Sequence, residues 1–391
     1  MKQKIRQTLK PLTHPIKELS DSGKLGGVLL ILSTILSITI TNSTLSPSYL
    51  KFWNTELGIY SLSMPINHWI NDLWMSVFFF YVGLEIKREL VNGELAEKKK
   101  ALLPFIAAIG GMFTPALLFI LINANTNNLH GWAIPTATDI AFSLGILSLL
   151  GNRVPLPLKI FLTALAIIDD LGGILIIALF YTHEIHFNYL AMALGIMLIL
   201  ALLNRQKISA FVYYIFPILL LWYCIYQSGV HATIAGVIAA FFIPTKNIEH
   251  YEHLLNKPVN YLILPLFALA NTTILLSGNS VYQLMSPLGI GVVVAMVAGK
   301  TFGITAFVWI SIKMQWCSLQ NNIHIKHICG VATIAGIGFT MSLFFTALSF
   351  THPESANIAK LAILLGSTLS AILGLIYLRF TLPTPLSPPS S

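Results

Sequence analysis

Charged residues are scarce in this sequence: Asp, Glu, Lys and Arg make up 10% of its 391 residues, whereas apolar residues make up 55%. Ordinary soluble domains carry about 25% charged residues. The composition therefore excludes a soluble globular fold. Because long apolar runs recur from Leu25 to Phe380, we expect an all-α polytopic membrane protein.

Cysteine is rare as well, and Cys224, Cys317 and Cys329 form no CxxC pair that would favour a metal or thiol-redox site. Gly299 and Lys300 resemble the end of a phosphate-binding loop, but that motif needs another glycine where the chain has Val294. No metal-enzyme constellation is visible either. We therefore expect neither an enzyme nor a bound cofactor.

About twelve apolar runs approach or reach the roughly 20 residues of a helical span. They cover residues 25–41, 67–87, 101–123, 131–150, 157–181, 187–203, 210–227, 229–243, 258–277, 287–311, 328–350 and 358–380. No cleavable signal sequence is recognisable before them. We predict a cytoplasmic N-terminal segment at 1–24, a membrane transport domain at 25–380, and a disordered cytoplasmic tail in the Pro- and Ser-rich residues 381–391.

Lys and Arg residues alternate with these runs, as they do when they mark cytoplasmic loops. They precede the first run and follow the even-numbered runs, and Lys51 and Lys360 are the exceptions. The pattern predicts that both termini are cytoplasmic, in a bacterial inner membrane. The net charge of +8 is therefore explained by the cytoplasmic loops, and we expect no nucleic-acid surface. Membrane lipid is the expected partner.

Two runs carry helix breakers in their middles, at residues 134–139 and 335–341. Irregular backbone at membrane depth needs protein or water to satisfy it, and paired interrupted helices often mark a transport site. The two breaks fall in corresponding places of two predicted three-helix repeats of opposite orientation, at about 101–182 and 287–380. The alternative is that both are merely flexible helices, since Gly and Pro are common in membrane spans.

Ionisable residues deep in apolar runs are the strongest functional signal, because burying them in lipid is costly. Asp169 and Asp170 lie near the middle of the fifth run, and Lys300 lies at a similar depth in the tenth. Two adjacent carboxylates resist joint ionisation, which suits a site that holds either protons or a hard cation. Lys300 is expected to pair with one carboxylate, because a lone buried ammonium is unfavourable.

Other polar residues leave more than one interpretation open. Asp139 follows Thr138 at the first break, where it either offsets the positive end of a half-helix, caps that helix, or binds a cation. Asp72 lies near the outer end of the second run, and Glu85 lies at its inner end in what is either a functional or a solvated charge cluster. A lone His231 is either a proton-relay residue or an interfacial packing residue.

The long loop at 42–66 is the main segment outside the apolar runs. Residues 56–64 show a partial alternation of apolar and polar side chains, which fits either a small hairpin or an irregular loop. Residues 45–65 are the candidate contact of a homodimer.

Several motifs in order resemble those of NhaA-type sodium/proton antiporters. They lie at 71–90, 131–142, 164–172, 229–237, 261–271, 299–300 and 336–342. The resemblance extends from about Gly26 to Arg379. It implies a fold in which two broken helices cross at mid-membrane.

The resemblance also implies roles for individual residues. Asp170 would be the principal Na⁺ ligand and Asp169 would lie beside it, paired with Lys300 in one state. Thr138 and Asp139 would line the crossing, with Asp139 offsetting the positive helix ends. Asp72 would have a supporting role, and the pH-response candidates would be Glu85, Glu252 and His231. Asn256 stands where some relatives have histidine, so the details of that response are expected to differ.

The predicted activity is secondary active exchange of intracellular Na⁺ or Li⁺ for extracellular protons, electrogenic and regulated by pH. Protons and cations would compete for the buried aspartates. An intramembrane aspartyl protease also uses two membrane aspartates, but on separate spans rather than adjacent in sequence. A channel is the other alternative, and it would conduct without coupling the two ions.

Overall fold

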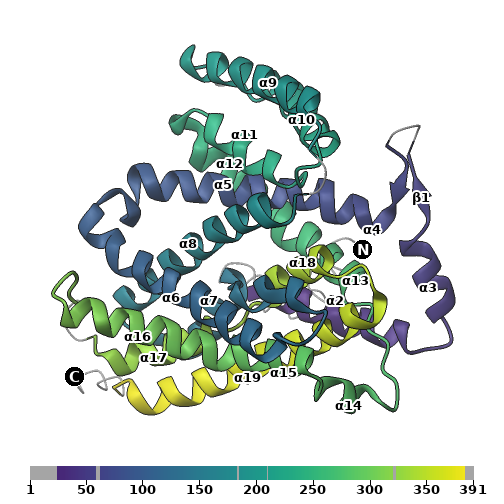
Figure 1. Ribbon diagram of the computed structural model, residues 1–391. Coiled ribbons are helices and arrows are strands. Elements are labelled where there is room, and N and C mark those ends of the chain that lie inside the picture. Colours follow the sequence, from purple (N-terminus) through teal and green to yellow (C-terminus); the bar gives the residue numbers. More distant parts are fainter. Residues whose placement is uncertain (1–23, 59–61, 183–184, 209, 320–322, 384–391) are drawn as a thin grey trace, which may run out of the picture.

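The computed structural model describes residues 24–58, 62–182, 185–208, 210–319 and 323–383. Nearly all of this material is helical, and the helices pack side by side (Figure 1). The chain is therefore an all-α polytopic membrane protein, as its composition predicts. The N-terminal segment at 1–23 and the tail at 384–391 lie outside the described residues.

Helices occupy each of the twelve predicted runs. In the first half they are α2 (Lys24–Thr41), α4 (Ile66–Trp69) continued by η2 (Ile70–Trp74) and α5 (Met75–Asn92), α6 (Lys98–Asn123), η4 (Leu129–Thr136) with α7 (Ile140–Ser148), α8 (Leu156–Phe180) and α9 (Phe187–Arg205). Short 3₁₀ turns, η3 (Glu94–Ala96) and η5 (Gly151–Arg153), lie between them.

The second half continues in the same way. Its helices are α10 (Val212–Gln227), α11 (Ile234–Phe242), α12 (Ile248–Pro258) with η7 (Val259–Ile263) and α13 (Leu264–Asn271), α15 (Pro287–Val294) with η8 (Ala295–Gly299) and α16 (Lys300–Lys313), α17 (Ile325–Ile334), α18 (Phe339–Ser349) and α19 (Pro353–Thr381). The connections include η6 (Thr245–Asn247) and α14 (Ser280–Leu284).

Only some of the helices are long and apolar enough to cross a membrane by themselves. Among the described residues, five helices pass on their own, at 98–123, 156–180, 187–205, 287–313 and 353–381. Two bent pairs, α2 with α3 (Ser46–Trp53) and α17 with α18, raise the number to seven. The remaining helices are short or interrupted, so the count of twelve spans and the three-helix repeats stay predictions.

The two predicted breaks are present, and they lie against each other. Residues 137–139 separate η4 from α7, and residues 335–338 separate α17 from α18 with a bend of 53°. The backbone N–H of Asp139 donates to the carbonyl of Ile337 at 2.7 Å. Each interruption therefore supplies a backbone partner for the other, as irregular backbone within an apolar fold requires.

Three π-helical turns, η2, η7 and η8, interrupt long helices that the sequence reads as continuous. Such turns are frequent at functional sites, because they rotate the following side chains relative to an α-helix. The turn η2 contains Asp72, and η8 ends immediately before Lys300. Apolar periodicity gave no sign of these turns.

Close packing of α6 against α16 fixes the position of Lys300. A Cβ atom on Gly110 would lie 2.5 Å from the Gly303 carbonyl oxygen, and one on Gly303 would lie 2.2 Å from the Gly110 oxygen. Small residues allow membrane helices to approach this closely. Because Gly303 lies one turn after Lys300, this contact brings the lysine into the centre of the fold.

The loop between α2 and α5 contains both a helix and a hairpin. Helix α3 turns away from α2 by 119°, and β1 (Glu56–Leu57) pairs antiparallel with β2 (Met64–Pro65). The hairpin projects from the helical body at one edge (Figure 1). Of the two interpretations of residues 56–64, the hairpin is the correct one, whereas α3 was not anticipated.

Candidate functional site

Asp139 lies at the junction of the two broken helices and is nearly fully buried. One carboxylate oxygen, Oδ1, accepts from the backbone N–H of Phe142 at 3.0 Å, in the first turn of α7. The other, Oδ2, accepts from the backbone N–H of Thr340 at 3.1 Å, in the first turn of α18, and from the Thr340 hydroxyl. One carboxylate therefore caps two helices, so capping and compensation of the positive helix ends coincide.

Asp169, Thr138 and Lys300 form a buried cluster beside this junction. The Lys300 ammonium lies 2.5 Å from Asp169 Oδ2 and donates to the Thr138 hydroxyl at 2.8 Å. That hydroxyl lies 2.6 Å from Asp169 Oδ2 and 2.9 Å from the Ala335 carbonyl oxygen. A hydroxyl has a single proton to donate, so Thr138 can serve only one of these two acceptors at a time.

The pairing of Lys300 with Asp169 is the geometry that their matched depth in the sequence suggests. Both side chains are fully enclosed, where an ammonium or a carboxylate without its partner would be strongly destabilising. The second oxygen of the aspartate, Oδ1, is buried and has no hydrogen-bond partner among the described residues. Asp169 therefore has one oxygen committed to Lys300 and one without a donor.

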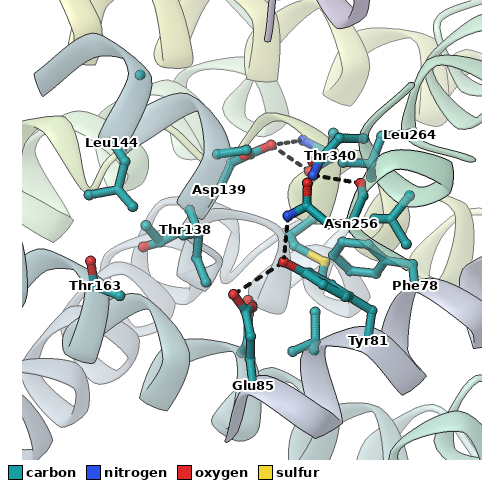
Figure 2. A pocket seen from close by; sticks show the side chains of 18 of the residues that line it. Phe78, Tyr81, Glu85, Thr138, Asp139, Leu144, Thr163, Asn256, Leu264 and Thr340 are labelled. Carbon is teal, nitrogen blue, oxygen red and sulfur yellow. Dashed lines mark hydrogen bonds between the residues drawn. The ribbon is translucent and has the colours of Figure 1, made fainter. Parts of the chain in front are cut away.

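Asp170 differs from its neighbour because no described residue donates a hydrogen bond to its carboxylate. It lines a cavity of about 530 Å³ that also reaches Asp139, Thr340 and Glu85. Figure 2 shows side chains from several helices around this space, including Thr138, Thr163 and Asn256. The cavity connects Asp170 to the end of the fold that carries Lys159 and Asn256.

A second, much smaller cavity lies on the other side of the aspartates. It has a volume of about 10 Å³ and is bounded by Asp169 and Asp170 together with apolar side chains, namely Phe79, Ala137, Gly173, Ile174, Ile177, Met341 and Phe345. This volume is about that of one water molecule measured in the same way. Asp170 is therefore accessible from one end of the fold, and both aspartates are enclosed by aromatic and aliphatic side chains toward the other end.

Glu85 faces the large cavity, and it belongs to a chain of hydrogen bonds. The Tyr81 hydroxyl donates to Glu85 Oε1 at 3.3 Å and accepts from Asn256 Nδ2 at 3.2 Å (Figure 2). These contacts link α5 to α12. The interpretation of Glu85 as part of a freely solvated surface cluster is therefore not supported by its position.

Glu252 forms a second link between α5 and α12. It accepts from Arg88 at 2.5 Å, and Arg88 also donates to Glu89 at 3.0 Å. Burial raises the pKa of Glu252, and the Arg88 guanidinium opposes that rise. The Arg88–Glu252 pair lies one helical turn from the Glu85 chain on each helix, so all of these groups form one polar strip.

Asp72 and His231 lie together, away from the aspartate pair. Their side chains approach to 3.6 Å between Asp72 Oδ1 and His231 Nε2. The imidazole also contacts the Thr233 hydroxyl at 2.9 Å and the edge of Phe344, with ring centroids 5.5 Å apart. Neither residue lines the large cavity, so the structure does not bring them to the site where Asp139, Asp169 and Asp170 meet.

Some residues of the site escaped the sequence reasoning. Thr340 belongs to the motif at 336–342, which could have suggested it, but its bonds to Asp139 were not foreseeable. Tyr81 gave no signal at all. Lys87, two residues after Glu85, gave no signal either: its ammonium donates to the carbonyls of Phe241 and Ile243 at the end of α11, where a cation stabilises the helix.

No group of three or more His, Cys, Asp and Glu side chains within the described ranges is arranged to hold a metal ion. The oxygen atoms that line the two cavities beside Asp170 come instead from three further carboxylates and several hydroxyl groups, those of Asp139, Asp169 and Glu85 and of Thr138, Thr163 and Thr340 among them. Hard monovalent and divalent cations prefer such oxygen ligands. The chemistry that this arrangement supports is reversible binding of a proton or a hard cation.

Comparison with known proteins gives a consistent result over almost the full chain. A family model described as "Na+/H+ antiporter 1" matches residues 17–378. Three curated proteins named Na(+)/H(+) antiporter NhaA are similar to it. The one from Flavobacterium johnsoniae, NhaA 1, is 45% identical, and the match covers 95% of this chain and 98% of the relative. The relative from Cytophaga hutchinsonii is 46% identical over 96% of this chain and 98% of its own length, and the relative from Aliivibrio salmonicida is 45% identical over 95% and 99%.

Proposed function

Because the chain belongs to the Na⁺/H⁺ antiporter 1 family, we propose that it expels Na⁺ or Li⁺ from the bacterial cytoplasm in exchange for protons. The exchange takes place at Asp170 and Asp169, which bind either the cation or protons. The protein acts as a transporter in the inner membrane and not as an enzyme, and the transported ions need no resident cofactor.

The observation that carries this proposal is the Asp170 carboxylate, which faces a cavity and receives no hydrogen bond from the described residues. A buried charge without donors is costly, so this group is stabilised only by a proton, a cation or water. Asp169 Oδ1, also without a partner, borders the same small cavity as Asp170. These two oxygens are the proposed primary ligands of the cation.

The Lys300 pair supports this assignment, because it occupies only Asp169 Oδ2. Asp169 can thus contribute Oδ1 while its other oxygen stays with Lys300. Thr138 is a further candidate ligand, since its hydroxyl oxygen can accept a cation once its proton is directed to Ala335. Asp139 is fully engaged by helix ends, so we assign it a supporting role in the charge balance.

The direction of access follows from the positive-inside pattern. The large cavity lies at the end of the fold with Lys159 and Asn256, which the distribution of Lys and Arg assigns to the cytoplasm. The proposed state is therefore open inward. Phe79, Ile174, Ile177 and Phe345, around the small cavity, separate the aspartates from the outside and must part when the site faces outward.

An electrogenic cycle would make this exchange effective at neutral pH. If one net positive charge enters per cycle, a membrane potential contributes about 2.3 kcal/mol per 100 mV. A tenfold Na⁺ gradient opposes with about 1.4 kcal/mol. The potential alone would then drive Na⁺ out without a pH gradient, which an electroneutral exchanger cannot do.

Two further assignments rest on position. Glu85 lines the large cavity, and Glu252 lies one helical turn before Asn256, which also lines it. We propose that both carboxyl groups contribute to the pH response; His231, paired with Asp72, is the third candidate. The hairpin β1–β2 within residues 45–65 projects from the helical body, and we propose it as the contact of a homodimer.

The test is cation-induced pH change in everted membrane vesicles. Addition of Na⁺ or Li⁺ should release protons from vesicles with the unmodified chain, whereas Asp170→Asn should show no release although it is made and inserted normally. Glu354→Gln, at an exposed carboxylate at the start of α19, is the matched control and should behave like the unmodified chain. Proton release by Asp170→Asn at the unmodified rate would rule the proposal out.

The same vesicles distinguish a channel from an exchanger. A channel would carry Na⁺ whether or not a proton gradient could form, so its Na⁺ flux would not respond to an imposed pH difference. An exchanger couples the two ions, and an imposed pH difference should drive Na⁺ movement in the opposite direction. An intramembrane protease would show neither response.

A further inference from the structure

His327 lies at the start of α17, just before the predicted eleventh span, and it joins two helix ends. Its Nδ1 accepts a hydrogen bond from the backbone N–H of His324 at 3.2 Å. Its Nε2 lies 3.3 Å from the backbone carbonyl oxygen of Thr381, at the end of α19. The residue is buried, with 3% of its surface exposed. A single side chain therefore connects the start of α17 to the end of α19.

The two contacts together define the protonation state of the ring. Nδ1 faces an N–H donor, so it must carry a lone pair, and Nε2 faces a carbonyl, so it must carry the proton. This is one tautomer of neutral imidazole. Protonation would place a second N–H at Nδ1, opposite the N–H of His324, and that hydrogen bond would be lost.

We propose that His327 is a pH-dependent clamp, which holds the backbone N–H of His324 on the first turn of α17 while its ring is neutral and releases that N–H when the ring is protonated. The release is local. The contact to Thr381 can persist, because Nε2–H remains a donor, whereas the cap on α17 cannot.

Most of the groups around His327 favour its neutral ring. The Lys326 ammonium and the His324 ring both disfavour a positive charge on His327. The centroids of the His324 and His327 rings lie 5.4 Å apart. The start of a helix also disfavours a cation. Within the described residues, α19 contributes the Thr381 carbonyl, which favours the charged ring.

The position of α17 gives the clamp a functional consequence. The other end of this helix supplies the Ala335 carbonyl to Thr138 and the Ile334 carbonyl to Ser143, so its movement would disturb the cluster around Asp169. This inference rests on the proposed exchange at that cluster. The clamp would reduce exchange at acidic pH even when Na⁺ is saturating, which competition at the aspartates alone does not do.

The primary test measures hydrogen exchange of the backbone amides at 324–328 in the full-length protein from pH 4.5 to 8, corrected for intrinsic exchange. In the unmodified chain, protection should fall about fivefold as the ring becomes charged, the factor expected for loss of one helix-cap hydrogen bond. His327→Asn keeps an acceptor near Nδ1, and His327→Gln keeps a donor near Nε2; neither titrates. Both should show protection that does not change with pH.

His324→Gln is the matched control, because it removes the neighbouring ring and leaves the backbone N–H that His327 accepts. It should retain the pH-dependent protection. Protection that falls equally with pH in the unmodified chain and in both His327 variants would overturn the clamp. An NMR signal showing a proton on Nδ1 of His327 at pH 8 would do the same.

Transport supplies a second measurement. At saturating Na⁺, the acid-side loss of exchange should be smaller in His327→Gln than in the unmodified chain. Because hydrogen exchange does not depend on transport, loss of the clamp signal and failure of the proposed exchange are separable. Unchanged acid-side loss in His327→Gln, with clamp release confirmed by hydrogen exchange, would disprove its effect on transport.

Discussion

The carboxylate of Asp139 accepts hydrogen bonds from both the backbone N–H and the hydroxyl of Thr340, 201 positions further along the chain. It also accepts from Phe142 in its own half-helix. These bonds fasten the first turns of α7 and α18 to one side chain. The two breaks are therefore stabilised jointly, and neither half-helix start is complete without the other.

Replacement of Asp139 should consequently affect stability as well as exchange. Asp139→Ala removes the caps of two helices and leaves buried donors without acceptors, which should cost about 2–4 kcal/mol in unfolding free energy. Asp139→Asn keeps one acceptor oxygen and should lose less. Denaturant unfolding in detergent compares the two, and an equal loss in both variants would contradict the double-cap interpretation.

The Lys300–Asp169 pair should show strong energetic coupling. Lys300→Ala leaves a buried carboxylate unpaired and should destabilise the protein by about 3–5 kcal/mol. In the background of Asp169→Asn the same change should cost much less, because no charge is left uncompensated. A double-mutant cycle measures the difference, and additive losses would show that the two side chains do not support each other in solution.

The Arg88–Glu252 pair predicts a pH-dependent difference in stability. Burial raises the pKa of Glu252 above its ordinary value and Arg88 opposes the rise, so Arg88→Gln should raise that pKa further. A carboxyl with a raised pKa holds its proton longer in the folded state, so stability falls as pH rises through the interval between the unfolded and folded values. The stability deficit of Arg88→Gln should therefore grow as pH increases.

Thermal unfolding of Arg88→Gln across pH 4.5–8 measures this deficit. Lys100→Gln is the control, because Lys100 pairs with Glu97 at an exposed position and surface pairs contribute little. It should give a small deficit that hardly varies with pH. A constant deficit for Arg88→Gln would show that Glu252 does not titrate differently when its partner is removed.

Close approach of α6 and α16 should make Gly110 intolerant of a side chain. A Cβ atom there would lie 2.5 Å from the Gly303 oxygen, so Gly110→Ala should separate the helices and destabilise the protein by about 1–3 kcal/mol. Gly195→Ala in α9 is matched, since nothing lies within 4 Å of its Cβ position. It should be neutral or slightly stabilising, and equal effects of the two changes would refute the packing argument.

Competition between protons and Na⁺ predicts how activity depends on both ions. Cations bind only deprotonated carboxylates, so exchange should fall on the acid side. Raising Na⁺ should move most of that fall to lower pH. Apparent Na⁺ affinity measured against pH in vesicles provides the test. A fall that stays at the same pH at every Na⁺ concentration would indicate control by a separate group, such as the Glu85 and Glu252 cluster.

The amino-acid sequence by itself determined which residues had to find partners. Charges at Asp169, Asp170 and Lys300 within apolar runs cannot remain solvated in lipid, and the breakers at 134–139 and 335–341 cannot continue a helix. Composition and breaker positions were therefore sufficient for the fold class and the two broken helices, whereas the alternation at 56–64 left a hairpin and an irregular loop both open.

Only the tertiary structure decided which partners these residues have. The bonds from Asp139 to Thr340, from Arg88 to Glu252 and from Tyr81 to Asn256 join helices far apart in the chain, and no local pattern encodes such pairs. The same holds for the separate roles of two adjacent aspartates. Neighbouring residues on a helix point about 100° apart, so Asp169 meets Lys300 while Asp170 meets a cavity, and helix packing alone fixes what lies in each direction.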